Sequence, residues 1–186
     1  MVRILFLDFD GPLYSHRSID AFQKIIPPEE HRNNPVFADY WVMDPVAVAL
    51  MNELAASVDN LKIVLSTSWV KPNLHTANDY QELFKVNGLN FELYQPHTTR
   101  WFTPRYELEP GTTEFTRYIY GRWSQIHRWL LQNDEPTTWA MVDDAESGGQ
   151  ILECDHDILF KCVMVDIVNG LKRPNIFRLR NLLLEH

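Results

Sequence analysis

Four short apolar runs, each ending in carboxylate or hydroxyl residues, constrain the fold of this chain more than any other feature. Val2–Leu7 leads into Asp8, and Leu61–Leu65 leads into a Ser-Thr-Ser triplet. Residues 139–142 and 159–165 form similar runs that also end directly before aspartate. Nearly continuous apolar runs of this length are typical of strands buried on both faces of a parallel sheet. The pattern therefore predicts a parallel sheet with polar residues after its strands.

Helical patterns lie between these runs and indicate the fold class. Apolar residues recur at helical spacing over residues 44–56, 124–132 and 174–184. Asp44, followed by a proline, is a typical N-cap, and a weaker strand is predicted at residues 91–94. Strands that alternate with helices predict an α/β fold with a mainly parallel sheet. The apolar positions expected to face the core include Val46, Leu50, Met51, Leu54, Ile126, Trp129, Leu130, Ile176, Leu179, Leu182 and Leu183.

The length of 186 residues suits one domain, which we predict to span residues 1–186. Residues 14–40 and 96–122 fit no simple helix or strand pattern and are predicted to be loops or insertions. The aromatic residues of the second segment favour an ordered loop near the site. Residues 184–186 resemble the start of a histidine tag and are interpreted as a tag remnant.

Charge, cysteine content and hydropathy exclude several classes of protein. The net charge is −8, from 17 basic and 25 acidic residues, which argues against nonspecific nucleic-acid binding through a basic surface. Cys154 and Cys162 are too few for a disulfide framework, and no apolar run approaches the roughly 18 residues of a membrane-spanning helix. No Gly-x-Gly-x-x-Gly pattern follows a predicted strand, which disfavours a dinucleotide-binding enzyme. We therefore expect a cytoplasmic protein with no membrane and no disulfide partner.

The polar residues that follow the predicted strands form a candidate site. Parallel strands bring their carboxyl ends to one edge of the sheet, where open α/β proteins bind ligands. That edge would carry Asp8, Asp10, Thr67, Asp143 and Asp144. So many carboxylates repel one another unless a cation lies between them, and oxygen ligands of this kind suit Mg²⁺. The sequence therefore predicts a magnesium-binding edge.

Several segments of the chain resemble the motifs of the haloacid-dehalogenase (HAD) superfamily. The Asp-Phe-Asp-Gly run at residues 8–11 resembles the first motif, Thr67 the hydroxyl motif, and the Asp-Asp pair at residues 143–144 the acidic motif. The Leu-Ser-Thr-Ser-Trp run at residues 65–69 and the Ile-His-Arg-Trp-Leu run at residues 126–130 are similar to those of small HAD domains in RNA-repair proteins. The resemblance implies a Rossmann-like HAD fold, with helices on both faces of the sheet and no large cap domain.

The resemblance also implies a reaction and a role for each residue of the site. Asp8 would be the nucleophile that forms an aspartyl-phosphate, and Asp10 would protonate the leaving oxygen and then deprotonate water. The acid role requires surroundings that raise the pKa of Asp10 above its ordinary value of about 3.9. Thr67 would donate a hydrogen bond to the phosphoryl group. Mg²⁺ would bind to Asp8, Asp144 and the backbone carbonyl of Asp10, and Asp143 would support or share the metal, so the main ligand of the Asp143–Asp144 pair stays open. The substrate would also contact Gly11, Ser66 and Ser68.

The resemblance further implies a cation near the nucleophile, because the family neutralises its phospho-intermediate with a basic residue, usually lysine. No lysine lies between residues 85 and 161, and the resemblance points instead to Arg122, ahead of the Ile-His-Arg-Trp-Leu run. Arg117 and Arg128 are weaker candidates. Arginine can perform this electrostatic role because its guanidinium is permanently charged.

Three residues near the motifs have more than one interpretation. His16 is a candidate substrate contact. Trp69 is interpreted as a core residue rather than as a platform for substrate. Pro12 replaces the threonine or valine that is frequent at this position of the family, and proline removes an amide donor. The geometry of dephosphorylation therefore depends on how the Pro12 loop is built.

The favoured function is a Mg²⁺-dependent phosphatase whose substrate is a phosphorylated small molecule, a nucleotide or a polynucleotide end. One alternative is a HAD-like protein that binds Mg²⁺ and phosphate without turnover, which the missing lysine and Pro12 would favour. Another is a phosphoacceptor receiver domain. Receivers carry an adjacent acidic pair early and the phosphorylated aspartate later, whereas here the Asp-x-Asp run comes first and the Asp-Asp pair late.

Overall fold

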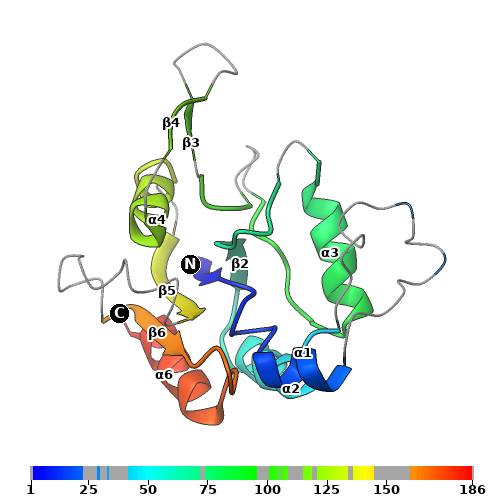
Figure 1. Ribbon diagram of the computed structural model, residues 1–186. Coiled ribbons are helices and arrows are strands. Elements are labelled where there is room, and N and C mark those ends of the chain that lie inside the picture. Colours follow the sequence, from blue (N-terminus) through cyan, green and yellow to red (C-terminus); the bar gives the residue numbers. More distant parts are fainter. Residues whose placement is uncertain are drawn as a thin grey trace.

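The computed structural model has a parallel β-sheet of four strands at its centre (Figure 1). The strands are β1 (Val2–Leu7), β2 (Leu61–Leu65), β5 (Pro136–Asp144) and β6 (Cys162–Val165), in the spatial order β2-β1-β5-β6. The structure describes residues 2–22, 29, 33, 42–71, 74–95, 101–104, 106–108, 115–118, 121–133, 136–144 and 160–185.

The register of the sheet aligns the carboxyl ends of its strands. Leu7, the last residue of β1, pairs with Leu65 of β2 and with Val142 of β5. Asp144, the last residue of β5, pairs with Val165 at the end of β6. The residues that follow these strands therefore begin at one edge of the sheet, as the sequence pattern predicted.

One face of the sheet is covered by three helices, α2 (Pro45–Ser57), α3 (Ala77–Val86) and α6 (Arg173–Leu184). Leu5 and Leu7 of β1 are fully buried in the core that these helices share with the sheet. The helix residues buried in this main core are Ala47, Val48, Leu50, Met51, Leu54, Tyr80, Leu83, Phe84, Ile176, Leu179, Leu182 and Leu183.

The opposite face of the sheet is covered by α4 (Arg122–Leu131). Ile4 and Phe6 point to this face because successive side chains of a strand alternate. They pack with Ile126 and Trp129 of α4, and the rings of Phe6 and Trp129 meet edge to face with centroids 5.3 Å apart. Helices on both faces of a parallel sheet confirm the predicted α/β, Rossmann-like architecture.

Three predicted strands have different boundaries in the structure. The strand predicted at residues 139–142 is longer, because β5 continues its pairing from Pro136 to Asp144. The strand predicted at residues 159–165 begins at Cys162, which is buried, whereas Cys154 lies outside the described residues. Residues 91–94 form no regular strand, although Leu93 forms an isolated parallel bridge with Ile63 of β2.

One side-chain prediction also differs from the structure. Val46 is 53% exposed, because the buried stripe of α2 begins at Ala47 and continues at spacings of three and four residues. Leu184, the first residue of the predicted tag remnant, is the last residue of α6 and packs against the main core. The tag interpretation itself stays a prediction.

Four elements were not predicted. Residues 14–40 contain the short helix α1 (His16–Phe22), and residues 96–122 contain an antiparallel hairpin of β3 (Tyr106–Leu108) and β4 (Phe115–Tyr118). The hairpin projects away from the central sheet beside α4 (Figure 1). The fourth is α3, whose N-cap Thr76 forms a capping box with the side chain of residue 79. This Thr-x-x-Asp spacing is a sequence signal that could have revealed the helix.

The described helices are all short. The longest, α2, has 13 residues, and α6 has 12. None of the helices in the described part of the chain is long and apolar enough to cross a membrane.

A comparison of Gly170 with Gly88 separates the effect of backbone strain on stability from the effect of side-chain crowding. Gly170, in the turn after β6, has a φ of +73°, and a Cβ added there would lie 2.9 Å from the Cβ of Ser15. Gly88, directly after α3, has the same φ of +73°, but a Cβ added there would meet nothing within 4 Å. Both positions favour glycine, and only the first is crowded.

We expect Gly170→Ala to lower the free energy of unfolding by roughly 2–5 kcal/mol, because left-handed backbone costs about 1–2 and overpacking about 1–3 kcal/mol. Gly88→Ala, the matched control, should lose only the backbone part, about 1–2 kcal/mol. Urea denaturation of both variants measures the difference. Equal losses would contradict the close contact between Gly170 and Ser15.

Candidate active site

β1 brings Asp8 to the sheet edge, and a tight loop follows it. The Asp8 amide donates to the carbonyl of Val142 at 3.1 Å, which extends the pairing of β1 with β5 by one residue. The amides of Leu13 and Tyr14 both donate to the carbonyl of Phe9 at 2.9 Å. These backbone hydrogen bonds close a tight turn around Pro12, and its effect on dephosphorylation stays a prediction.

Gly11 allows this loop to approach the end of β5. Its φ is +82°, and a Cβ added there would lie 2.9 Å from the Cβ of Asp144. Glycine meets both demands because it lacks a Cβ. The Gly11 amide donates to the carbonyl of Tyr14 at 2.9 Å, so this N–H is already used within the loop. Its role in substrate binding stays a prediction.

Three buried carboxylates converge at this edge of the sheet. Asp8, Asp143 and Asp144 each have a carboxylate oxygen within 4.8 Å of the other two. Their exposed fractions are 1%, 1% and 2%. They follow or end the adjacent strands β1 and β5, so the parallel register is what brings them together. The expected crowding of carboxylates is therefore present.

Arg122, the first residue of α4, faces this cluster. Its Nη2 lies 3.3 Å from Asp8 Oδ1, and its Nε donates to Asp143 Oδ2 at 2.8 Å. The Arg122 side chain is only 10% exposed. The N-cap of α4 is Gly121, whose φ of +77° is a conformation that favours glycine. The arginine that the resemblance pointed to thus contacts two of the three carboxylates.

Burial governs the ionisation of the cluster. It raises the pKa of Asp8 well above its ordinary value, and the Arg122 guanidinium only partly opposes this rise. Burial also raises the pKa of Asp143, again against the effect of Arg122. Repulsion between these two carboxylates adds to the rise for Asp8. One guanidinium therefore does not neutralise the negative charge of three buried carboxylates.

The cluster fits a divalent cation such as Mg²⁺. Both carboxylate oxygens of Asp8 are buried, and the Arg122 guanidinium and the Thr67 hydroxyl beside them leave part of their hydrogen-bonding capacity unmet. Burial removes water from these oxygens without full replacement of its hydrogen bonds. A bound cation would compensate for that loss. Asp8, Asp143 and Asp144 are the side chains that could hold the metal. Asp143 also accepts the Asp144 amide at its Oδ1, at 2.9 Å, and Arg122 at its Oδ2.

Asp10 lies at the same edge and is partly buried. The indole Nε1 of Trp69 donates to Asp10 Oδ2 at 3.0 Å. Burial raises the pKa of Asp10, while the Trp69 hydrogen bond and the nearby His16 oppose the rise. A raised carboxyl pKa is what a general acid requires.

The three hydroxyl residues after β2 differ in their surroundings. Thr67 is buried beside Asp8, where its hydroxyl favours the ionised carboxylate against the larger effect of burial on the Asp8 pKa. Ser66 is also buried, and its Oγ lies 3.3 Å from Thr103 Oγ1, a contact between β2 and the segment beside it. Ser68 is exposed. The predicted substrate contacts of Ser66 and Ser68 stay predictions.

The hydrogen bond of Trp69 was missed by sequence reasoning. Trp69 packs against the main core, as interpreted, but its indole N–H also bonds a carboxylate of the site. Partly buried tryptophan needs such a partner, and its place two residues after Thr67 was the available signal. Of the weaker cation candidates, Arg128 is exposed on α4, and the side chain of Arg117 lies outside the described residues.

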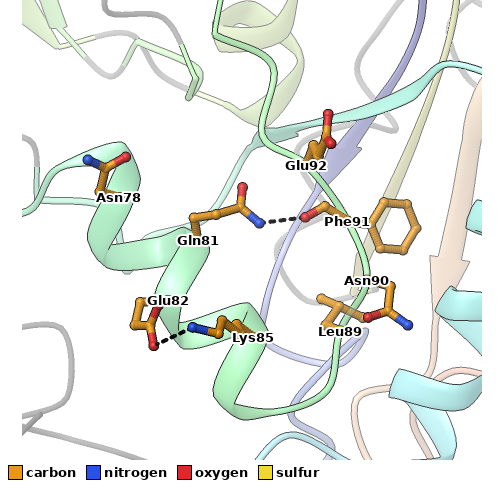
Figure 2. A pocket seen from close by; sticks show the side chains of 8 residues that line it. All are labelled: Asn78, Gln81, Glu82, Lys85, Leu89, Asn90, Phe91 and Glu92. Carbon is orange, nitrogen blue, oxygen red and sulfur yellow. Dashed lines mark hydrogen bonds and ion pairs between the residues drawn. The ribbon is translucent and has the colours of Figure 1, made fainter. Parts of the chain in front are cut away.

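A separate pocket of about 510 Å³ lies between α3 and the segment that follows it (Figure 2). Gln81 reaches across, donating to the carbonyl of Phe91 at 2.6 Å and accepting from the amide of Leu93 at 3.1 Å. Glu92 pairs with Lys62 near the start of β2, so the pocket lies towards the amino ends of the strands. Its polar side chains thus fasten a segment to the sheet, away from the carboxylates.

Comparison with protein families decides the assignment of the chain. Residues 4–176 match the family described as the HAD domain in Swiss Army Knife RNA repair proteins. The chain belongs to this HAD family. Comparison with curated proteins and with solved structures gave no match. The resemblance drawn from the motifs is therefore confirmed, and this HAD domain falls within the phosphatase and hydrolase superfamily.

We expect Arg122→Met to lower the free energy of unfolding by about 3–5 kcal/mol in EDTA, because it leaves buried carboxylates without their cation. Arg128→Met, on the exposed side of the same helix, should change it by about 0.5 kcal/mol or less. Urea denaturation of the two variants beside the wild type gives the comparison. If the Arg122 and Arg128 variants were equally stable, Arg122 would not neutralise the cluster.

Proposed function

We propose that this HAD domain is a Mg²⁺-dependent phosphatase that hydrolyses phosphomonoesters through an aspartyl-phosphate on Asp8. The observation that carries the proposal is the buried Asp8 carboxylate, which lies beside two further buried carboxylates and faces Arg122 at 3.3 Å. A desolvated carboxylate is a stronger nucleophile than a hydrated one, and the guanidinium favours its ionised form against the effect of burial.

The first half of the reaction would transfer the phosphoryl group to Asp8. An Asp8 oxygen forms a bond to phosphorus, the P–O ester bond breaks, and the leaving oxygen takes the proton of Asp10. Arg122, held by Asp143, would balance charge on Asp8 and on the phosphoryl oxygens. The Thr67 hydroxyl, beside Asp8, would donate to a phosphoryl oxygen.

The second half would restore the enzyme. Asp10, now ionised, takes a proton from water as the water oxygen bonds to phosphorus, and the bond between phosphorus and the Asp8 oxygen breaks. The products are inorganic phosphate and the original pair of carboxyl groups. Asp10 is suited to both steps because burial raises its pKa, although the Trp69 hydrogen bond limits the rise.

Mg²⁺ would be held by Asp8 and Asp144, with the backbone carbonyl of Asp10 as the third protein ligand that the family resemblance implies. When bound, the ion supplies positive charge that offsets repulsion between the anionic nucleophile and an anionic phosphate ester. Asp143 would support the site by holding Arg122 through the hydrogen bond of 2.8 Å, and it would support or share the metal.

Nucleotide or polynucleotide phosphates are the substrate class that we propose. The support is the family description, which refers to RNA repair proteins.

We expect a higher kcat/KM for 5′- or 3′-phosphorylated oligonucleotides than for p-nitrophenyl phosphate. A panel of both oligonucleotides, free nucleotides and p-nitrophenyl phosphate tests this. A clear preference for free nucleotides or for p-nitrophenyl phosphate would contradict a polynucleotide role.

Asp8→Asn is expected to abolish phosphate release, lowering kcat by at least about 10³-fold, because an amide cannot form the acyl-phosphate. EDTA should abolish release by the wild type, and added Mg²⁺ should restore it. Release of inorganic phosphate from p-nitrophenyl phosphate and from the oligonucleotides is the measurement.

Asp59→Asn makes the same chemical change at an exposed residue next to β2, at the amino end of the strands, and should keep full activity. Undiminished release by Asp8→Asn would refute the nucleophile. If the wild type bound Mg²⁺ but released phosphate from no substrate, the chain would instead be a binding protein without turnover.

A further inference from the structure

The Trp69 indole touches the acid–base carboxyl of the proposed phosphatase. Its Nε1 donates to Asp10 Oδ2 at 3.0 Å, and no other hydrogen bond of the Asp10 carboxyl occurs within the described residues. An indole N–H can only donate, so it occupies Oδ2 as an acceptor whether Asp10 is protonated or ionised. The contact therefore leaves Oδ1 as the oxygen that can exchange a proton with substrate.

Trp69 is itself held firmly, so it can set the orientation of the carboxyl. Its ring stacks on that of Tyr14, with centroids 4.9 Å apart and planes 8° from parallel. Phe9 meets the same ring edge to face at 5.7 Å. The Tyr80 hydroxyl donates to the Trp69 carbonyl at 2.8 Å, and the Trp69 amide donates to Thr67 Oγ1 at 3.3 Å. Packing and hydrogen bonds thus fix both the side chain and the backbone of Trp69.

The support of Trp69 comes from the same loop that carries Asp10. Phe9 and Tyr14 lie on either side of Asp10 in this loop, and the Tyr14 carbonyl accepts the Gly11 amide. The backbone of Trp69 is fixed to the hydroxyl motif through Thr67. Trp69 therefore links the segment after β2 to the loop after β1, in addition to the backbone pairing of the two strands.

We infer that Trp69 is a positioning residue that holds the Asp10 carboxyl with Oδ1 directed to the leaving group. This inference rests on the proposed phosphatase function and deepens it. In the step concerned, the Asp8 oxygen bonds to phosphorus, the ester P–O bond breaks, and its electron pair takes the proton from Asp10. Trp69 takes no part in that exchange and acts only through the orientation of the carboxyl.

The dependence on the leaving group separates this role from ordinary packing. p-Nitrophenolate is a stable anion and needs little protonation as it leaves, whereas phenolate needs more. Both esters carry one phenyl ring, so a lost stacking contact between Trp69 and substrate would affect them alike. The ratio kcat/KM reports the steps up to departure of the leaving group and excludes the later hydrolysis of the aspartyl-phosphate.

The test compares Trp69→Phe with wild type on phenyl phosphate and p-nitrophenyl phosphate, with Mg²⁺ present. Phenylalanine keeps a ring against Tyr14 but has no N–H. We expect kcat/KM for phenyl phosphate to fall at least about tenfold and that for p-nitrophenyl phosphate less than about threefold, since a well-placed general acid contributes about 10²–10⁴-fold. The matched control is Trp139→Phe, because Trp139 is a half-buried tryptophan that packs on the α4 face of the sheet. This substitution should leave kcat/KM for both esters unchanged.

Each outcome bears on one of the two proposals. Equal losses for both esters would overturn the inference and leave Trp69 as a packing residue or a substrate platform, and so would no loss for either. If the wild type hydrolysed p-nitrophenyl phosphate but not phenyl phosphate, the inference would also be overturned, because no leaving group would then be protonated. A wild type that hydrolyses neither ester, nor any phosphorylated nucleotide, would overturn the proposed function itself.

A second measurement covers the case in which Trp69→Phe does not fold. In protein labelled with ¹⁵N-tryptophan, the indole resonance of Trp69 should shift in Asp10→Ala, because its acceptor is lost. The other indole resonances should stay in place. An unchanged set of indole resonances in Asp10→Ala would show that the hydrogen bond is absent and would overturn the inference.

Discussion

The ion pairs of Arg122 with Asp8 and Asp143 are the interaction on which the rest of the site depends. The parallel register of β1 and β5 forces three carboxylates into a buried space, where their repulsion is strong and unscreened. Without a metal ion, the fold is stable only if a positively charged side chain from outside the sheet enters that space. α4 supplies it from its first residue, which ties this helix to the chemistry as well as to the core.

Close packing then limits how the loops around this charge cluster can be built. Gly11 approaches Asp144 so closely that no side chain fits between them. Further along the same loop, the Ser15 hydroxyl donates to the buried N-cap Asp44 of α2 at 3.3 Å, and Gly170 packs on Ser15. The loop after β1 is thus fastened to β5, α2 and the turn after β6. Such fastening holds the acidic residues of the site in place without help from a ligand.

Sequence reasoning predicted most of the sheet and the acidic edge but few of the contacts around it. The apolar runs and the polar residues that follow them identified β1 and β2, because strands buried on both faces form nearly continuous apolar runs. The hairpin in residues 96–122 was missed because aromatic residues there carry no strand period that separates them from a loop. The Trp69 hydrogen bond was missed because a tryptophan beside a strand packs in the core far more often than it bonds a carboxylate.

By itself, the sequence determined the α/β fold class, the order of the motifs, and the acidic residues at the carboxyl ends of the strands. These follow from local pattern, since hydropathy period and strand-end residues are read along the chain. Only the tertiary structure decided that Arg122 lies between Asp8 and Asp143, and that Trp69 bonds Asp10. These pairs are separated by between 21 and 114 residues, and their contacts depend on how helices and loops pack on the sheet. Distances across a packed fold are set by the sum of many side-chain volumes, which no local pattern records.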